Sequence, residues 1–155
     1  MIKTITAARL TALATTAKSA ARLRTNLNLH DSPDAPVQRL FVSTEPETYI
    51  RPHRHPRANK WELFVVLRGE IDLLIFSDSG KLLERINMSP TATQAVEIPA
   101  GTWHSYACKQ PGTLALEVKE GPYIPTPEPD FAPWSPAEGS EESSAYLAWM
   151  RETLP

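Results

Sequence analysis

Three histidines and one glutamate have the types and spacing that could bind a metal ion. His53 and His55 lie two residues apart, so in an extended chain both imidazoles leave the same face, roughly 7 Å apart along the backbone. Glu62 follows in a strand-like segment, and His104 ends the segment PAGTWH, where Pro and Gly can aim a side chain from a strand start. Such ligands suit iron, manganese, nickel, copper or zinc. The sequence therefore predicts one divalent metal site, against the alternative that these are surface imidazoles on a strand.

These residues form two motifs, H-x-H followed by Glu and Gly, and P-x-G-x-x-H, which resemble the two motifs of cupins. The spacer before Glu62 is longer than in the commoner cupin pattern, and Cys108 stands where the second motif often has Asn. Five segments more narrowly resemble the WbuC-type cupin-fold metalloproteins: NLNLH at 26–30, PVQRLFV at 36–42, TYIRPHRHP at 48–56, KWELFVVLRG at 60–69 and KEGPY at 119–123. The resemblance implies a single antiparallel jelly-roll β-barrel with a metal in its mouth, and a link to surface-polysaccharide biosynthesis.

Length and composition restrict the function classes. A chain of 155 residues fits one domain, and 16 basic against 18 acidic residues give a net charge of −2 without a basic run, so we expect no nucleic-acid binding. No apolar run is long enough to cross a membrane, and the single cysteine, Cys108, excludes an intrachain disulfide. We therefore expect a soluble, cytoplasmic protein in which Cys108 is a small buried side chain.

The N-terminal segment permits two interpretations. Residues 1–24 carry five basic residues, no acid and many Ser, Thr and Ala, a composition typical of organelle-targeting segments. The apolar residues between Leu10 and Ala21 also fall at helical spacing, with Thr6 as a cap. We favour a helix at 6–22, packed on the outside of the barrel, because it runs directly into the NLNLH segment.

The rest of the chain is read as mainly β, with a proline-rich C-terminal arm that ends in a helix. The capping box SPAE at 135–138 predicts the start of this helix, and Ser140, followed by two glutamates, could cap it again; the helix continues to about Glu152. We divide the chain into an N-terminal helix and linker (1–36), a cupin barrel (37–124) and an arm with a helix (125–155). The expected strands are at 37–44, 48–55, 60–67, 70–77, 82–88, 95–98, 102–108 and 114–119.

Alternation along the strands nominates further side chains for the pocket. Arg51 shares the face of the H-x-H histidines, Lys60 lies on the face of Glu62, and Tyr106 lies on the face of His104. We expect these three as catalytic candidates, either as proton donors or as contacts for an anion, although each could also make simple hydrogen bonds.

Three other side chains complete this interpretation. A buried arginine needs an anion, so Arg51 should meet either a structural carboxylate such as Glu117 or a carboxylate or phosphate of the substrate. Trp103 has the opposite parity to the metal ligand beside it and is expected to pack. His30 lies outside both motifs and is expected to be solvated or hydrogen-bonded.

We interpret the chain as a metal-binding protein that acts on a small polar or anionic molecule, such as a sugar derivative. The first hypothesis is isomerisation or epimerisation by proton transfer beside the metal. The alternatives are an iron-dependent oxygenase and a non-catalytic binding or sensing module, and the sequence leaves open whether the chain is an enzyme at all. The closing helix carries aromatic residues that could pack on the barrel or on the partner of a homodimer.

Overall fold

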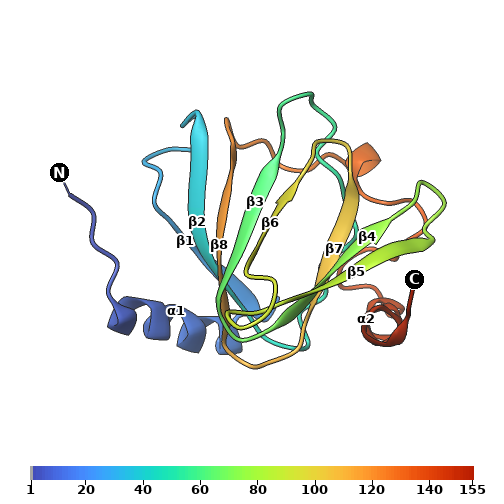
Figure 1. Ribbon diagram of the computed structural model, residues 1–155, viewed down its shortest axis with the longest axis horizontal. Coiled ribbons are helices and arrows are strands. Elements are labelled where there is room, and N and C mark those ends of the chain that lie inside the picture. The colour runs from blue at the N-terminus through green and yellow to red at the C-terminus, as the bar shows by residue number, and fades with distance from the viewer. Residues whose placement is uncertain (1) are drawn as a thin grey trace.

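The computed structural model describes residues 2–155 and shows two antiparallel sheets that face each other, with a helix near each end of the chain (Figure 1). One sheet has five strands in the order β1-β2-β8-β3-β6, and the other has three in the order β5-β4-β7. The elements are α1 (Ala7–Ser19), β1 (Arg24–Asn28), β2 (Val37–Thr44), β3 (Glu62–Arg68), β4 (Ile71–Phe76), β5 (Leu82–Met88), β6 (Ala95–Ile98), β7 (Trp103–Cys108), β8 (Thr113–Glu120), the 3-10 helix η1 (Glu128–Asp130) and α2 (Ser143–Glu152).

The predicted fold class is confirmed: the chain is mainly β, jelly-roll-like, and has both helices. One detail of the prediction is wrong. Among residues 2–155 no strand of one sheet pairs with a strand of the other, so the sheets form an open sandwich instead of a closed barrel. The edges of both sheets therefore remain unpaired, which a closed barrel would have avoided.

Seven of the eight predicted strands are present, and the missing one is the segment 48–55. Here the backbone makes only isolated bridges at His53, one to His104 and one to Phe131. Pro52 and Pro56 lack the amide hydrogen that a regular ladder needs, which explains why this apolar-polar alternation does not become a strand.

Two apolar clusters hold the molecule together. The first fills the space between the sheets and includes Phe64, Val66, Ile71 and Leu73. The second lies on the other face of the three-stranded sheet, where Leu74 and Phe76 of β4 pack against residues of α2 such as Leu147 and Met150. Both faces of β4 are therefore buried, which is why its sequence is almost continuously apolar.

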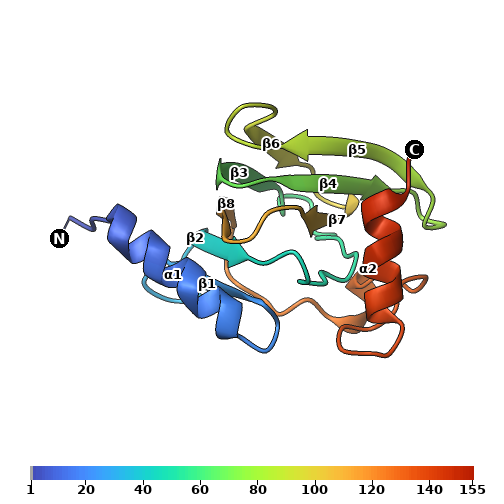
Figure 2. The same cartoon turned by 90° about the horizontal axis from the view of Figure 1, so that it is seen from below.

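Helix α1 lies along the outside of the five-stranded sheet, as predicted, and contacts β1 and β2 (Figure 2). Thr6 caps it, because its hydroxyl accepts a hydrogen bond from the Arg9 amide at 3.2 Å. Ala14 and Ala17 form its buried stripe. Among the described residues neither helix has the length and apolarity needed to cross a membrane.

The segment 121–142, called the arm below, runs from β8 past the metal-ligand candidates to α2. The predicted capping box at 135–138 is wrong as a helix start, because α2 begins only at Ser143. Glu138 is used differently: its carboxylate accepts hydrogen bonds from Arg22 at 2.6 Å and Arg24 at 2.8 Å. This side chain therefore ties the arm to the start of β1 and to the residues just before it.

Candidate metal centre

The candidate metal centre begins with the irregular segment that holds His53 beside β7. The His53 amide donates to the His104 carbonyl at 3.0 Å, and the His104 amide donates back at 2.9 Å. On the other side of this segment, the arm accepts from Arg54 and donates to Pro52. His53 is therefore fixed between β7 and the arm although it belongs to no regular strand.

Of the remaining candidate ligands, Glu62 and His104 come from the inner faces of the two sheets, and His55 comes from the same irregular segment as His53. Glu62 opens β3, and its side chain is buried on the same face as Phe64 and Val66. His104 lies on β7, and the turn before it is fixed by a hydrogen bond from the Gly101 amide to the His55 carbonyl at 2.8 Å. The two histidine motifs thus meet through their backbones.

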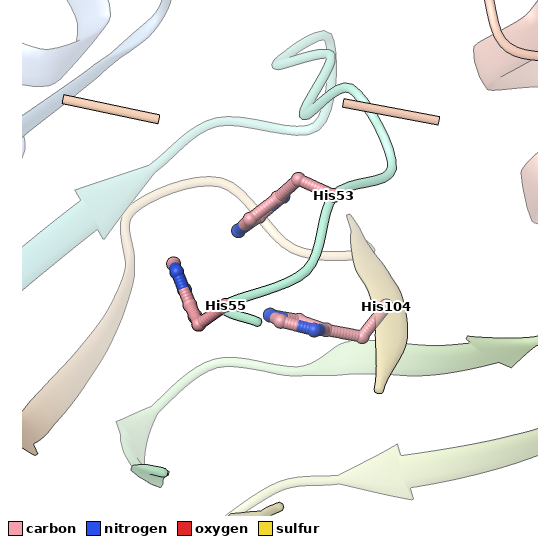
Figure 3. A group of neighbouring side chains, drawn as sticks. All are labelled: His53, His55 and His104. Atoms are coloured by element: carbon pink, nitrogen blue, oxygen red, sulfur yellow. The ribbon is translucent and has the colours of Figure 1, made fainter. Parts of the chain in front are cut away.

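The three imidazoles converge (Figure 3). One possible ligand atom from each of His53, His55 and His104 lies within 4.8 Å of the others. The ring centroids of His53 and His104 are 4.5 Å apart, and those of His53 and His55 are 5.2 Å apart. This spacing leaves room for one ion bound by all three rings, so the group could hold a metal.

Backbone hydrogen bonds select the nitrogen that each ring can offer. Nδ1 of His53 lies 3.0 Å from the Arg51 carbonyl, and Nδ1 of His104 lies 2.9 Å from the Thr102 carbonyl. A carbonyl only accepts, so both Nδ1 atoms carry the proton and both Nε2 atoms keep a lone pair. The buried Nε2 of His104 has no hydrogen-bond partner among residues 2–155, and a metal would satisfy it.

Glu62 lies beside two of the three rings. Its Oε2 is 3.1 Å from Nε2 of His55 and 3.8 Å from Nε2 of His104. The group of described residues whose ligand atoms all lie within 4.8 Å of one another contains only the three imidazoles, so the role of Glu62 as a fourth ligand remains a prediction. At these distances the carboxylate could bind the same ion or hold the imidazole of His55 by a hydrogen bond.

Burial sets the charge states of these groups. It lowers the pKa of His53 to about 3, helped by the neighbouring His104, and it also lowers the pKa of His104. Burial alone would raise the pKa of Glu62, but the hydrogen bond from His55 and the positive charge of Lys119 outweigh it and lower this pKa. The centre therefore offers the neutral imidazoles of His53 and His104 and an ionised carboxylate, which are the protonation states that metal ligands need.

A cavity of about 140 Å³ lies between the sheets next to the imidazoles. His53, Glu62 and His104 form part of its wall. Tyr106 also lines it, as the strand parity predicted, and burial raises the pKa of this phenol, so its hydroxyl remains protonated.

Two other predicted site residues lie elsewhere. The guanidinium of Arg51 donates to Glu128 at 2.9 Å and lies 5.0 Å from the centre of the Phe131 ring, so its anionic partner belongs to the arm and is neither Glu117 nor a group in the cavity. The ammonium of Lys60 donates to the carbonyls of Glu120 and Pro122, each at 3.0 Å. The parity argument therefore misplaced Arg51, whereas Lys60 lines a cleft on the outer side of the imidazoles together with His55 and makes the simple hydrogen bonds that were one of its expected roles.

The remaining sequence interpretations can be placed as well. Trp103 is buried under α2 and donates from its indole to Asp78 at 2.9 Å. Nδ1 of His30 accepts from the Arg39 amide at 3.0 Å, away from the three imidazoles. Cys108 is buried, as expected.

An open cleft of about 130 Å³ lies on the outer side of the imidazoles, between the segment 54–61 and the arm. His55 forms part of its wall. Arg54, Arg57 and Lys60 bring positive charge to this cleft, and Trp61 and Tyr123 bring aromatic surface.

The sequence interpretation missed Lys119, which lines both the cleft and the cavity. It lies on the inner face of β8, opposite Glu62 in register, and pairs with Glu117. The available signal was the alternation in β8, where Glu117 and Lys119 share a face with Ala115. Alternating charges usually mark a solvent face, which is why this signal did not suggest a pocket.

Solved structures with a similar fold include a protein described as a cupin. KdgF from Halomonas sp. matches with a TM-score of 0.52 and 19% identity over 66% of this chain and 81% of that chain. A cupin superfamily protein from Desulfitobacterium hafniense DCB-2 matches with a TM-score of 0.52 and 18% identity over 70% and 86% of the two chains. An oxalate oxidase in complex with the substrate analogue glycolate matches with a TM-score of 0.53 and 19% identity over 68% of this chain, but over only 55% of that chain.

At these identities the likeness shows the fold alone, so the chain has a cupin fold, and the narrower resemblance to WbuC-type proteins stays a prediction. A comparison with curated proteins finds no match. Residues 5–88, more than half of the chain, match the family model described as Domain of unknown function (DUF6016), and the chain therefore belongs to that family.

Proposed function

We propose that this protein holds a divalent transition metal at His53, His55 and His104, with Glu62 as fourth ligand, and acts there on a small polar or anionic molecule such as a sugar derivative. The observation that carries the proposal is the convergence of three imidazoles around the unpartnered Nε2 of His104. Open space on both sides of the imidazoles, the cavity and the cleft, supports a role beyond structural metal binding.

The proposed reaction is proton transfer of the isomerase or epimerase type. When bound, the metal would supply a Lewis acid that polarises a carbonyl oxygen. Burial and the charge of Glu62 raise the pKa of Glu117, which is the direction that a general base working near neutral pH requires. Tyr106 keeps its proton and can donate a hydrogen bond to an oxygen of the ligand in the cavity. We assign proton transfer to Glu117 and Tyr106, in place of Arg51 and Lys60.

The test is solvent proton exchange. Manganese-loaded protein is incubated in D₂O with a panel of keto and aldo sugars and sugar acids, and deuterium at the carbon next to the carbonyl is measured by NMR. We expect incorporation with at least one compound, and none with His53→Ala. Elemental analysis of both proteins accompanies the assay. Incorporation that stays at the level of His53→Ala with every compound would contradict the proposed reaction, whereas failure of the wild type to retain any divalent metal would contradict the site.

Oxygen-dependent oxidation at iron is a second candidate, because three imidazoles and a carboxylate also support that chemistry and one solved structure of similar fold is an oxalate oxidase. The two reactions separate in anaerobic assays with ferrous ion, in which oxidation stops and isomerisation continues. The proposed link to surface polysaccharide rests on the WbuC-type sequence resemblance.

A further inference from the structure

Lys119 is placed where it can contact a ligand on either side of the imidazoles. Its side chain lines the inner cavity together with Glu62 and His104, and it lines the outer cleft together with His55. Its backbone partner across the sheet is Glu62 itself, so its position is fixed by the register of β8 on β3. The side chain is 23% exposed, and its ammonium is paired with the carboxylate of Glu117.

A contribution to stability does not by itself explain why Lys119 and Glu117 form an ion pair here. Glu117 follows on the same inner face, is 12% exposed and lies opposite Phe64 in register. Replacing a buried ion pair by apolar side chains is often neutral or stabilising, so such a pair is weak support for a purely structural role. Here it lies on the wall of a cavity instead of inside a packed core.

The charges around this cavity favour an anion. A divalent ion, Lys119 and Arg24 would contribute four positive charges, and Glu62 and Glu117 contribute two negative ones, so two positive charges remain on the wall. One of them, on Arg24, is paired with Glu138. The outer cleft adds Arg54, Arg57 and Lys60 against the acids Glu120 and Asp130. An excess of positive charge on the wall of a cleft raises the local concentration of anionic ligands.

The volume of the cavity limits the size of the ligand. An apolar cavity of about 150 Å³ holds a benzene molecule, so the space of about 140 Å³ beside His53 and His104 suits a group of about six heavy atoms. A larger ligand would have to extend past Lys119 into the outer cleft.

We propose that Lys119 is a specificity-determining residue that binds the carboxylate of a small organic acid beside the metal, with Glu117 as its counter-ion in the absence of ligand. The inference rests on the proposed metal site and narrows the ligand class of that site from polar molecules to small carboxylates. Lys119 is a contact for the ligand and carries no proton-transfer step.

Glycolate and its neutral amide, glycolamide, are matched probes, because they differ in charge and hardly in size. Binding of each to manganese-loaded protein is measured by isothermal titration calorimetry. We expect the wild type to bind glycolate more tightly than glycolamide. Lys119→Met should weaken the affinity for glycolate by at least about tenfold, the effect of losing a hydrogen bond to a charged group. The affinity of Lys119→Met for glycolamide should change by less than about twofold, and Lys119→Arg should restore most of the affinity for glycolate.

Lys109→Met is the control, because it removes a paired ammonium near Glu70 and Asp72, outside the cavity. It should bind glycolate like the wild type. Glu117→Gln is a second variant, in case Lys119→Met does not fold or takes up little metal. Because it removes the counter-ion of Lys119, it should bind glycolate more tightly than the wild type and bind glycolamide equally well.

The outcomes separate this inference from the proposed function. If metal-loaded Lys119→Met binds glycolate as tightly as the wild type, or Glu117→Gln binds it no more tightly, Lys119 has only a structural role and the metal site stands. If metal-loaded wild type binds neither probe, or binds both equally, the small-carboxylate ligand is wrong. If the wild type holds no divalent metal, the proposed function itself fails.

Discussion

At the scale of single residues, the feature that most favours a metal is the different role of the two ring nitrogens in His53 and His104. In His53 and His104, Nδ1–H donates a hydrogen bond to a backbone carbonyl, and this leaves Nε2 as the ligand atom. Both carbonyls belong to the residue two positions earlier, Arg51 and Thr102. The same local geometry therefore recurs in the two motifs, although 51 residues separate them in the chain and only one of them lies in a regular strand.

The buried state of His53 should make the metal-free protein sensitive to acid. Unfolded His53 takes up its proton near pH 6.5, whereas folding lowers this pKa to about 3. Below pH 6.5 the unfolded state therefore binds more protons, and stability falls as the pH falls, by up to about 1.4 kcal/mol per pH unit for this group. His104 acts in the same direction. Glu117 opposes both, because burial raises its pKa.

The contribution of His53 is isolated by urea unfolding of chelator-treated protein at two pH values, 6.5 and 4.5. These are the ordinary pKa values of histidine and glutamate side chains. We expect wild type to lose more stability across this interval than His53→Ala does, while His30→Ala, which removes a half-buried histidine away from the three imidazoles, should match the wild type. Equal losses in wild type and His53→Ala would show that His53 is not held neutral by burial.

Prediction from the sequence succeeded at the residue scale where a regular strand carries the side chain. Glu62 and Tyr106 lie in β3 and β7, and alternation placed both on the inner faces. The same rule misplaced Arg51, because Pro52 interrupts the ladder between it and His53, so the alternation of faces does not continue across this position.

The tight turn between β3 and β4 is an element that depends on one glycine. Gly69 has φ +79°, and a Cβ atom there would lie 2.2 Å from the Thr113 hydroxyl and 2.8 Å from its backbone Cα. Gly139 has φ +80° but no neighbour within 4 Å of the same atom. Gly139→Ala should cost only the backbone strain, about 1–2 kcal/mol, and Gly69→Ala about 1–3 kcal/mol more through the clash. Urea unfolding checks both values, and similar costs for the two variants would contradict the close packing of Gly69 on β8.

The arm is a second element, and Arg51 holds it. Besides its contacts to Glu128 and Phe131, this guanidinium reaches the Ala132 carbonyl at 3.4 Å. Arg51→Met should lower the free energy of unfolding by about 1–3 kcal/mol and speed proteolysis within the arm, because it removes charge-assisted hydrogen bonds from a side chain that is only 11% exposed. Arg57→Met, which removes an exposed guanidinium, should do neither. If proteolysis were unchanged in Arg51→Met, the arm would be held by other contacts.

The elements that the sequence interpretation missed are those with a weak or misleading local pattern. Strand β1 has a single large apolar residue, Leu27, and pairs at the edge of the sheet with β2, so its alternation is weak. The SPAE segment has the local pattern of a helix start, but Glu138 is engaged by Arg22 and Arg24, more than a hundred residues earlier. Long-range ion pairs of this kind leave no periodic signal in a single sequence.

At the scale of the whole molecule, the candidate ligands connect parts of the fold that share few other contacts. Glu62 belongs to the five-stranded sheet, His104 to the three-stranded sheet, and His53 to the segment between β7 and the arm. Among the described residues the two sheets are joined by no strand pairing, so their association depends on the apolar cluster between them. An ion held by ligands from both sheets would therefore act as a cross-link of the sandwich.

Metal binding should consequently raise the unfolding temperature of the entire molecule. At a free metal concentration of about 100 times the dissociation constant, binding to the folded state alone adds about 2.7 kcal/mol, which corresponds to about 5–11 °C for a domain of this size. We expect manganese or zinc to produce such a shift in calorimetry, and EDTA to reverse it. His104→Ala should show no shift because the ligand from the three-stranded sheet is missing, whereas His30→Ala should respond like the wild type. A shift of equal size in His104→Ala would place the stabilising ion elsewhere and remove the proposed connection between the sheets.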